Sequence, residues 1–128
     1  MPVASQYEQA VRVYFNLLER GDYAGLLNLF SKYAVVDFPL YGEMQASEFL
    51  NDLKKDSTKS KTTILNIYES AKFGAVAAHF SCQWIMRNAQ FTNYEGVGLF
   101  QISPEGKIDK LSFIFDTAKL GESTKRVR

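Results

Sequence analysis

Three side chains of this sequence could transfer a proton or donate a hydrogen bond to a ligand. Asp37 lies just before Phe38 and Pro39 at the end of an apolar run. If its carboxylate were buried in an apolar pocket, its pKa would rise and it could act as a base near neutral pH. Side chains alternate along a strand, so Asp37 points outward if Phe38 points inward. His79 could act as a general acid or base, and Tyr14 could donate a hydrogen bond from a pocket wall.

Each of these residues also has an ordinary structural interpretation. Asp37 could simply end a strand, His79 could be a hydrogen-bonded strand residue, and Tyr14 could fill the core. Ser81 and Gln83 follow His79 at alternate positions and could anchor a ligand. No base stands in a pattern that would make Ser81 a nucleophile.

The segment "AVAAHFSCQWIMR" predicts a strand whose two faces differ. One face is apolar and consists of Val76, Ala78, Phe80, Cys82, Trp84 and Met86, whereas the other is mixed and consists of Ala75, Ala77, His79, Ser81, Gln83 and Ile85. We expect the mixed face to line a cavity and the apolar face to meet a second subunit. Burying Val76, Phe80, Trp84 and Met86 would contribute roughly 6–12 kcal/mol per subunit, comparable with an association cost of about 4–15 kcal/mol. The alternative is that the apolar face is the core and the mixed face is solvated.

Composition excludes several functional classes. The net charge is +1 with Lys and Arg scattered along the chain, which argues against nucleic acid as a partner. One Cys excludes an intramolecular disulfide, and one His with one Cys makes a zinc site of the usual type unexpected. We expect no metal, no cofactor and no membrane partner, and the absence of an apolar leader predicts a cytoplasmic protein. Aromatic residues make up 14% of the chain, which is typical of a cavity lined by large side chains.

The elements that would position these residues are helices in the first half and strands in the second. Ser5 with Glu8 forms a capping-box pattern, Gly21 ends the first helix, and Asp22 can cap a second. A short strand follows at "YAVVDF", and Ser47 can cap a third helix.

The polar segment "KKDSTKSK" predicts a loop. Four strands then follow in meander order at about 62–70, 75–87, 90–103 and 107–116. The fold class is therefore α+β, in one domain spanning 1–128 with a frayed tail at about 121–128.

The segments "RGDYAGLLNLF", "GVGLFQI", "EGKI" and "FIFDTAKL" resemble the nuclear transport factor 2-like superfamily, in its ketosteroid isomerase and polyketide cyclase (SnoaL-like) branch. The resemblance runs from about Tyr7 to Leu120. It implies a cone-shaped curved sheet wrapped on three helices, an apolar pocket, and dimerisation through the outer face of the sheet. The fold hosts both enzymes and binding modules, so it does not by itself define an activity.

The resemblance also locates the catalytic positions of ketosteroid isomerases. Tyr14 matches the oxyanion tyrosine, but Phe38 stands at the base position and Gly98 at the position of the protonated acid. In the epoxide hydrolases of the same superfamily, the catalytic positions match about His79, Ser81 and Phe113. Asp116 matches a widely shared chain ending. Neither set of catalytic carboxylates is present.

These observations predict an apolar pocket for a small lipophilic molecule. Tyr14, His79, Ser81 and Gln83 would supply polar contacts, and the apolar wall would consist of Phe38, Ile85, Tyr94, Phe100, Phe113 and Phe115. Two functions stay open. The protein either binds a ligand without catalysis, or it is a cofactor-independent isomerase, cyclase or hydrolase that uses Asp37 or His79 for proton transfer.

Overall fold

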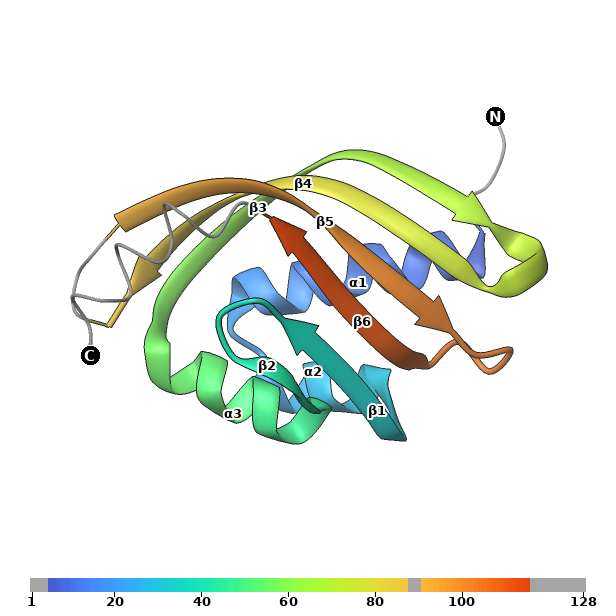
Figure 1. Ribbon diagram of the computed structural model, residues 1–128, viewed down its shortest axis with the longest axis horizontal. Coiled ribbons are helices and arrows are strands. Elements are labelled where there is room, and N and C mark those ends of the chain that lie inside the picture. The colour runs from blue at the N-terminus through green and yellow to red at the C-terminus, as the bar shows by residue number, and fades with distance from the viewer. Residues whose placement is uncertain (1–4, 88–90, 116–128) are drawn as a thin grey trace.

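The computed structural model describes residues 5–87 and 91–115, and within them three α-helices precede or interrupt a six-stranded sheet (Figure 1). The helices are α1 (Gln6–Arg20), α2 (Tyr23–Leu29) and α3 (Ala46–Asp56), and a 3₁₀ turn spans Ala71–Phe73. No helix in the described part of the chain is long and apolar enough to cross a bilayer. The predicted tail at 121–128 and Asp116 lie outside the described residues.

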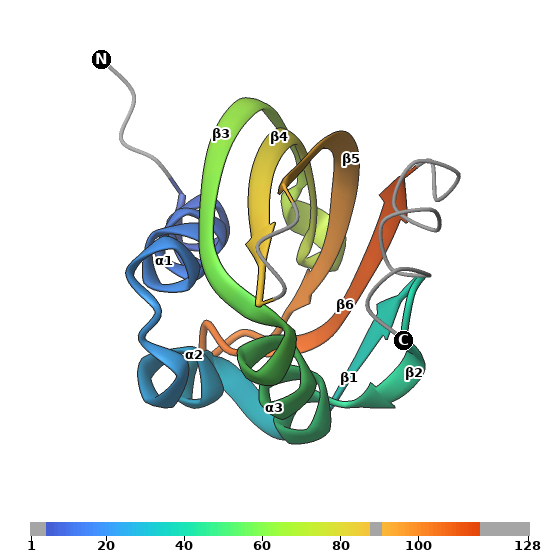
Figure 2. The same cartoon turned by 90° about the vertical axis from the view of Figure 1, so that its left-hand side faces the viewer.

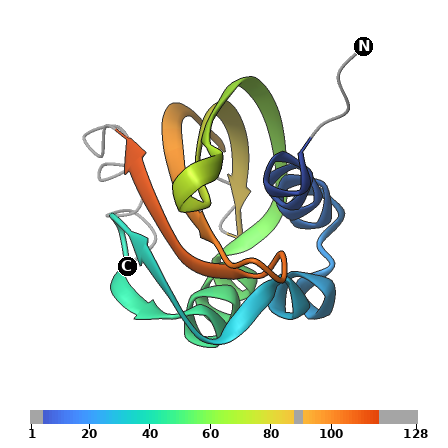
Figure 3. The same cartoon turned by 90° about the vertical axis from the view of Figure 1, so that its right-hand side faces the viewer.

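The sheet has the order β2-β1-β6-β5-β4-β3, and only the β1–β6 pair is parallel. Its strands are β1 (Phe30–Phe38), β2 (Gly42–Gln45), β3 (Ser57–Ser70), β4 (Ala75–Met86), β5 (Phe91–Ile102) and β6 (Ile108–Phe115). The long strands β3, β4 and β5 arch over α1, while α2 and α3 lie near one end of the curved sheet (Figures 2 and 3). The predicted α+β class and curved sheet are confirmed.

Local sequence signals explain where the first two helices begin and end. The Ser5 hydroxyl accepts a hydrogen bond from the Glu8 backbone N–H, as expected of an N-cap. Gly21 ends α1 with a φ of 70°, a conformation in which a side chain would be strained. Asp22 caps α2 by accepting from the Gly25 N–H at 2.9 Å. The prediction for Ser47 is wrong, because α3 already begins at Ala46 and its N-cap residue forms no side-chain capping bond.

The segment predicted as a polar loop instead forms the end of α3 and the start of β3. Lys54, Lys55 and Asp56 are the last residues of α3, and β3 begins at Ser57. Since β3 is an edge strand with one face toward solvent, much of its beginning can be polar without being a loop. The short strand β2 is not among the elements that the sequence predicted.

The two faces of β4 have the reverse of the predicted orientation. The apolar face is the protein core: Val76, Ala78, Phe80, Cys82, Trp84 and Met86 are each at most 5% exposed. The mixed face, with His79, Ser81 and Gln83, lies on the outer side of the sheet. The predicted interface through Val76, Phe80, Trp84 and Met86 is therefore wrong, because these side chains are already buried in the core of a single chain.

Gly96 of "GVG" in β5 makes room for the neighbouring strand β6, and Gly98 makes room for the Phe100 ring of β5 itself. A Cβ atom on Gly96 would lie 2.8 Å from the Ile114 carbonyl oxygen and 2.9 Å from the Phe115 Cβ, both on β6. A Cβ atom on Gly98 would lie 3.0 Å from the Phe100 ring. The space that these glycines leave is thus filled by the protein.

Candidate ligand-binding site

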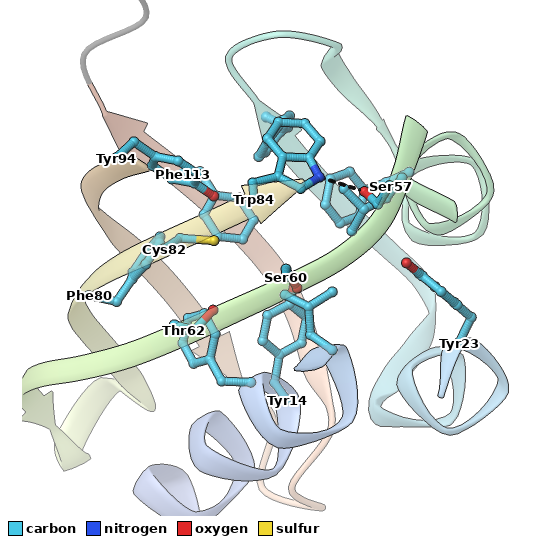
Figure 4. A pocket seen from close by; sticks show the side chains of 15 residues that line it. Tyr14, Tyr23, Ser57, Ser60, Thr62, Phe80, Cys82, Trp84, Tyr94 and Phe113 are labelled. Carbon is cyan, nitrogen blue, oxygen red and sulfur yellow. Dashed lines mark hydrogen bonds between the residues drawn. The ribbon is translucent and has the colours of Figure 1, made fainter. Parts of the chain in front are cut away.

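A pocket lies between the inner face of the sheet and the helices (Figure 4). The side chains around it nearly fill it, and the free space between them is about 30 Å³. This is far smaller than a small-molecule site, so the pocket is nearly closed by its own rings. Its lining residues are Tyr14, Phe15, Leu18, Tyr23, Phe38, Phe49, Leu53, Ser57, Ser60, Thr62, Phe80, Cys82, Trp84, Tyr94 and Phe113.

Tyr14 carries a hydroxyl that has no hydrogen-bond partner within the part of the chain that the structure describes. The side chain is 0% exposed, and its ring packs edge-on against Phe15, Phe30 and Phe100 at centroid distances of 5.1, 6.2 and 5.5 Å. Burial, with smaller effects from Cys82 and Tyr23, raises the pKa of Tyr14 far above its usual value. Tyr14 therefore remains a neutral donor in an apolar site.

A second polar group in the pocket is formed by Thr62, Cys82 and Tyr94. The Cys82 sulfur is buried, and Thr62 and Tyr94 line the same pocket. Burial raises the pKa of the Cys82 thiol and holds the pKa of Tyr94 well above its usual range. Nearby, the Trp84 indole N–H donates to the Ser57 hydroxyl at 2.7 Å (Figure 4). All of these groups are neutral near pH 7.

The described lining residues include no Asp, Glu, His, Lys or Arg. A general base must be unprotonated near the working pH and within reach of the proton that it removes. Tyr14, Tyr94 and Cys82 instead have raised pKa values because they are buried. The pocket can donate and accept hydrogen bonds, but the described side chains that line it supply no base near neutral pH.

Asp37 and Phe38 point in opposite directions. Phe38 is 3% exposed and packs against Phe49 and Phe113, each at 5.4 Å between ring centroids. Asp37 is exposed and stands opposite Glu43 of β2 in the sheet. The outward orientation that strand alternation predicted for Asp37 is confirmed, and this carboxylate does not line the pocket.

The mixed-face residues of β4 do not meet Tyr14. His79 Nε2 lies 3.1 Å from a Glu95 carboxylate oxygen on the outer face, and the Glu95 side chain is 63% exposed. Ser81, Gln83 and Ile85 alternate with pocket residues and so lie on the same outer face as His79. The structure thus places these four outside the pocket, because the opposite face of β4 is the one under the helices.

Of the predicted wall, Phe38, Tyr94 and Phe113 line the pocket together with Tyr14. Phe100 packs behind Tyr14, and Phe115 packs on Tyr94 at 4.7 Å. Sequence reasoning missed the lining residues Tyr23, Ser57, Ser60, Thr62, Phe80, Cys82 and Trp84. The sequence could have indicated three of these residues, because Phe80, Cys82 and Trp84 share the apolar face of β4.

No protein family and no curated protein matches this sequence, but solved structures match its fold. An NTF2-like protein of unknown function from Burkholderia pseudomallei K96243 has a TM-score of 0.79 at 16% identity, over 91% of this chain and 95% of its own. A protein assigned to the SnoaL-like polyketide cyclases, from Shewanella putrefaciens CN-32, has a TM-score of 0.76 at 11% identity, over 96% and 88%. A computationally designed 17-OHP binder has a TM-score of 0.77 at 14% identity, over 88% and 95%.

The chain therefore has the NTF2-like fold, as the sequence resemblance predicted. At these identities the similarity establishes the fold, and the function has to come from the pocket itself.

We predict that Tyr14→Phe stabilises the ligand-free protein. The substitution removes a buried hydroxyl without a described partner, and such a group costs about 1–3 kcal/mol. Urea unfolding should therefore show an increase of that size in the free energy of unfolding. Tyr33→Phe, at a position that is 79% exposed, should change little. Tyr41→Phe should destabilise the protein, because it removes the 2.6 Å hydrogen bond to Asp56. A loss of stability in Tyr14→Phe would contradict this assignment.

Stability should also fall above pH 10 in a way that depends on Tyr14. Because burial raises the folded-state pKa of Tyr14, the unfolded chain loses this proton first as the pH rises, and the folded form loses stability. The contribution of Tyr14 to the free energy of unfolding is fully present below pH 10, the ordinary pKa of a tyrosine, and decreases by up to about 1.4 kcal/mol per pH unit above it. Comparing urea unfolding of wild type and Tyr14→Phe between pH 8 and 11 isolates this effect. Equal slopes in the two proteins would contradict the prediction.

Proposed function

We propose that this protein binds a small lipophilic molecule carrying a hydrogen-bond acceptor, and does so without catalysing a reaction. The observation that carries the proposal is the Tyr14 hydroxyl, which is buried in an apolar pocket without a described partner. A ligand carbonyl, ether or hydroxyl oxygen placed beside Tyr14 would satisfy this donor. The desolvation penalty that the free protein carries would then favour binding.

The shape of the pocket supports an apolar ligand. Most of its lining consists of aromatic and aliphatic side chains, with polar atoms at only a few positions. Since the rings nearly close the pocket, a ligand must displace some of them. The rings of Phe38 and Phe113 have no hydrogen-bonding group, and the Trp84 indole is held by one hydrogen bond to Ser57. The designed 17-OHP binder is a precedent for ligand binding by this fold.

The enzyme alternative depends on Asp37 or His79 reaching the substrate. Asp37 is exposed on β1, and His79 contacts Glu95 on the outer face. Neither is among the residues that line the pocket. The similarity to a SnoaL-like cyclase keeps enzymatic chemistry within the range of this fold, but the geometry favours binding.

Trp84 provides a direct test, because it is the only Trp of the chain and lines the pocket. We expect 2-acetylnaphthalene and 2-ethylnaphthalene to quench Trp84 fluorescence saturably. Tyr14→Phe should weaken binding of the acetyl compound by about ten-fold, corresponding to one hydrogen bond to a buried donor, and should leave the ethyl compound unchanged. Tyr33→Phe should bind both as wild type does. Saturable quenching by neither compound would contradict the proposal, and equal effects of Tyr14→Phe on both would remove Tyr14 from the site.

We further propose that the outer face of the sheet joins two copies of the chain. Tyr68, Ala77, Leu99 and Ser112 stand opposite one another on four adjacent strands, and Tyr68 and Leu99 are 61% and 42% exposed. An apolar row of this kind on a sheet face is suited to a self-complementary contact. The proposed interface thus lies on the face of β4 opposite to that of Val76, Phe80, Trp84 and Met86, the face that the sequence predicted.

Sedimentation velocity tests this interface. Wild type should sediment as a dimer at micromolar concentration, and Leu99→Glu should shift it to monomer because a charge would be buried in the contact. Leu27→Glu is the control, since Leu27 is 46% exposed on α2, away from this face. A monomeric wild type, or a dimer unaffected by Leu99→Glu, would overturn the assignment.

A further inference from the structure

A second hollow opens beside the pocket and shares four lining residues with it. Leu18, Tyr23, Ser57 and Ser60 line both, so the two spaces are adjacent. The second hollow has a volume of about 390 Å³. Its other lining residues are Glu19, Arg20, Gly21, Lys54, Lys59 and Arg87. The four cations Arg20, Lys54, Lys59 and Arg87 are called the cationic mouth below.

The cationic mouth concentrates positive charge. Among the described residues that line this hollow, Glu19 is the only acidic one, so these residues carry three net positive charges, whereas the whole chain carries one. The remaining residues therefore sum to a net negative charge. The cations come from separate elements: Arg20 ends α1, Lys54 lies in the last turn of α3, and Lys59 lies near the start of β3.

Helix ends explain part of this charge. Arg87 donates from Nε to the Lys55 carbonyl at 2.7 Å and from Nη2 to the Lys54 carbonyl at 3.0 Å, so it caps the C-terminus of α3. Lys59, by contrast, lies on a strand. Among the ion pairs formed by the described residues, none involves Arg20, Lys54 or Lys59. Arg87 bonds to backbone carbonyls, so none of the four cations is neutralised by a described carboxylate.

The lining residues become more polar from the interior of the pocket toward the cationic mouth. Aromatic rings and Tyr14 occupy the interior, the hydroxyls of Tyr23, Ser57 and Ser60 form a collar, and the cations follow. Burial raises the pKa of Tyr23, and the nearby Arg87 charge offsets part of that rise. Such an order is complementary to a molecule with an apolar body and one charged end.

We propose that the ligand is an amphipathic anion, whose apolar body fills the pocket and whose carboxylate, sulfonate or phosphate lies at the cationic mouth. This inference rests on the proposed binding function and adds the charge of the ligand to it. The anionic group would lie near Lys54 and Lys59, with water on its outer side. Its attraction to these lysines should decrease with added salt.

The test uses two probes that share an apolar body. N-phenyl-1-naphthylamine is neutral, and 1-anilinonaphthalene-8-sulfonate adds a sulfonate to the same rings. Both are titrated with wild type, Lys54→Gln and Lys59→Gln, by probe fluorescence and by energy transfer from Trp84. Lys72→Gln is the matched control, because Lys72 is exposed in the turn after β3, outside the mouth.

We expect the sulfonate to bind more tightly than the neutral probe. Lys54→Gln and Lys59→Gln should each weaken binding of the sulfonate probe by about two- to five-fold, the range of an exposed charge pair, and should not change binding of the neutral probe. Lys72→Gln should bind both probes as wild type does. Inorganic phosphate should displace the sulfonate no better than sodium chloride at equal ionic strength.

Three results would overturn the inference. If the neutral probe binds and the sulfonate binds no better, the pocket is a ligand site but the mouth does not select anions. If phosphate alone displaces the sulfonate, the mouth is an independent anion site. If neither probe quenches Trp84, the proposed binding function fails together with this inference.

Discussion

The buried Tyr14 hydroxyl is the constraint on which the interpretation of this pocket depends. The ring is held by edge-on contacts with Phe15, Phe30 and Phe100, which come from three different elements. Packing of this kind fixes the direction of the hydroxyl and excludes water from most of its surroundings. Removing the hydroxyl would make the protein more stable, so its presence is explained better by a ligand than by folding.

Much of the fold could be predicted from the sequence, whereas the inner face of the sheet could not. Ser5, Gly21 and Asp22 mark helix ends by local chemistry that acts within a few residues. The alternation along β4 correctly separated its two faces, but alternation is symmetrical and does not say which face the helices cover. Choosing the wrong face moved His79 and Ser81 into the expected site and moved Cys82 and Trp84 out of it. Ser57 and Ser60 were missed because a polar edge strand and a loop have similar compositions.

The described residues that line the pocket include hydrogen-bond donors but no carboxylate or imidazole base. Phe38 occupies the position where the resemblance placed a catalytic carboxylate, and it contributes a ring to the wall instead. Burial raises the pKa values of Cys82 and Tyr94, so both groups are neutral near pH 7. The charged side chains lie at the cationic mouth and not among the described residues of the interior, and at the mouth water can still solvate them. Recognition can thus be divided between an apolar interior and a charged opening.

The measurement that tests this account most directly is a high-resolution crystal structure of the protein purified from its native cells without added ligand, examined beside the Tyr14 hydroxyl. The account predicts density for an organic molecule in the pocket, with an oxygen atom within hydrogen-bond distance of Tyr14 and with the rings of Phe38 or Trp84 displaced. A closed pocket in which Tyr14 bonds only to a water molecule, both in that crystal and in crystals soaked with 2-acetylnaphthalene, would contradict it.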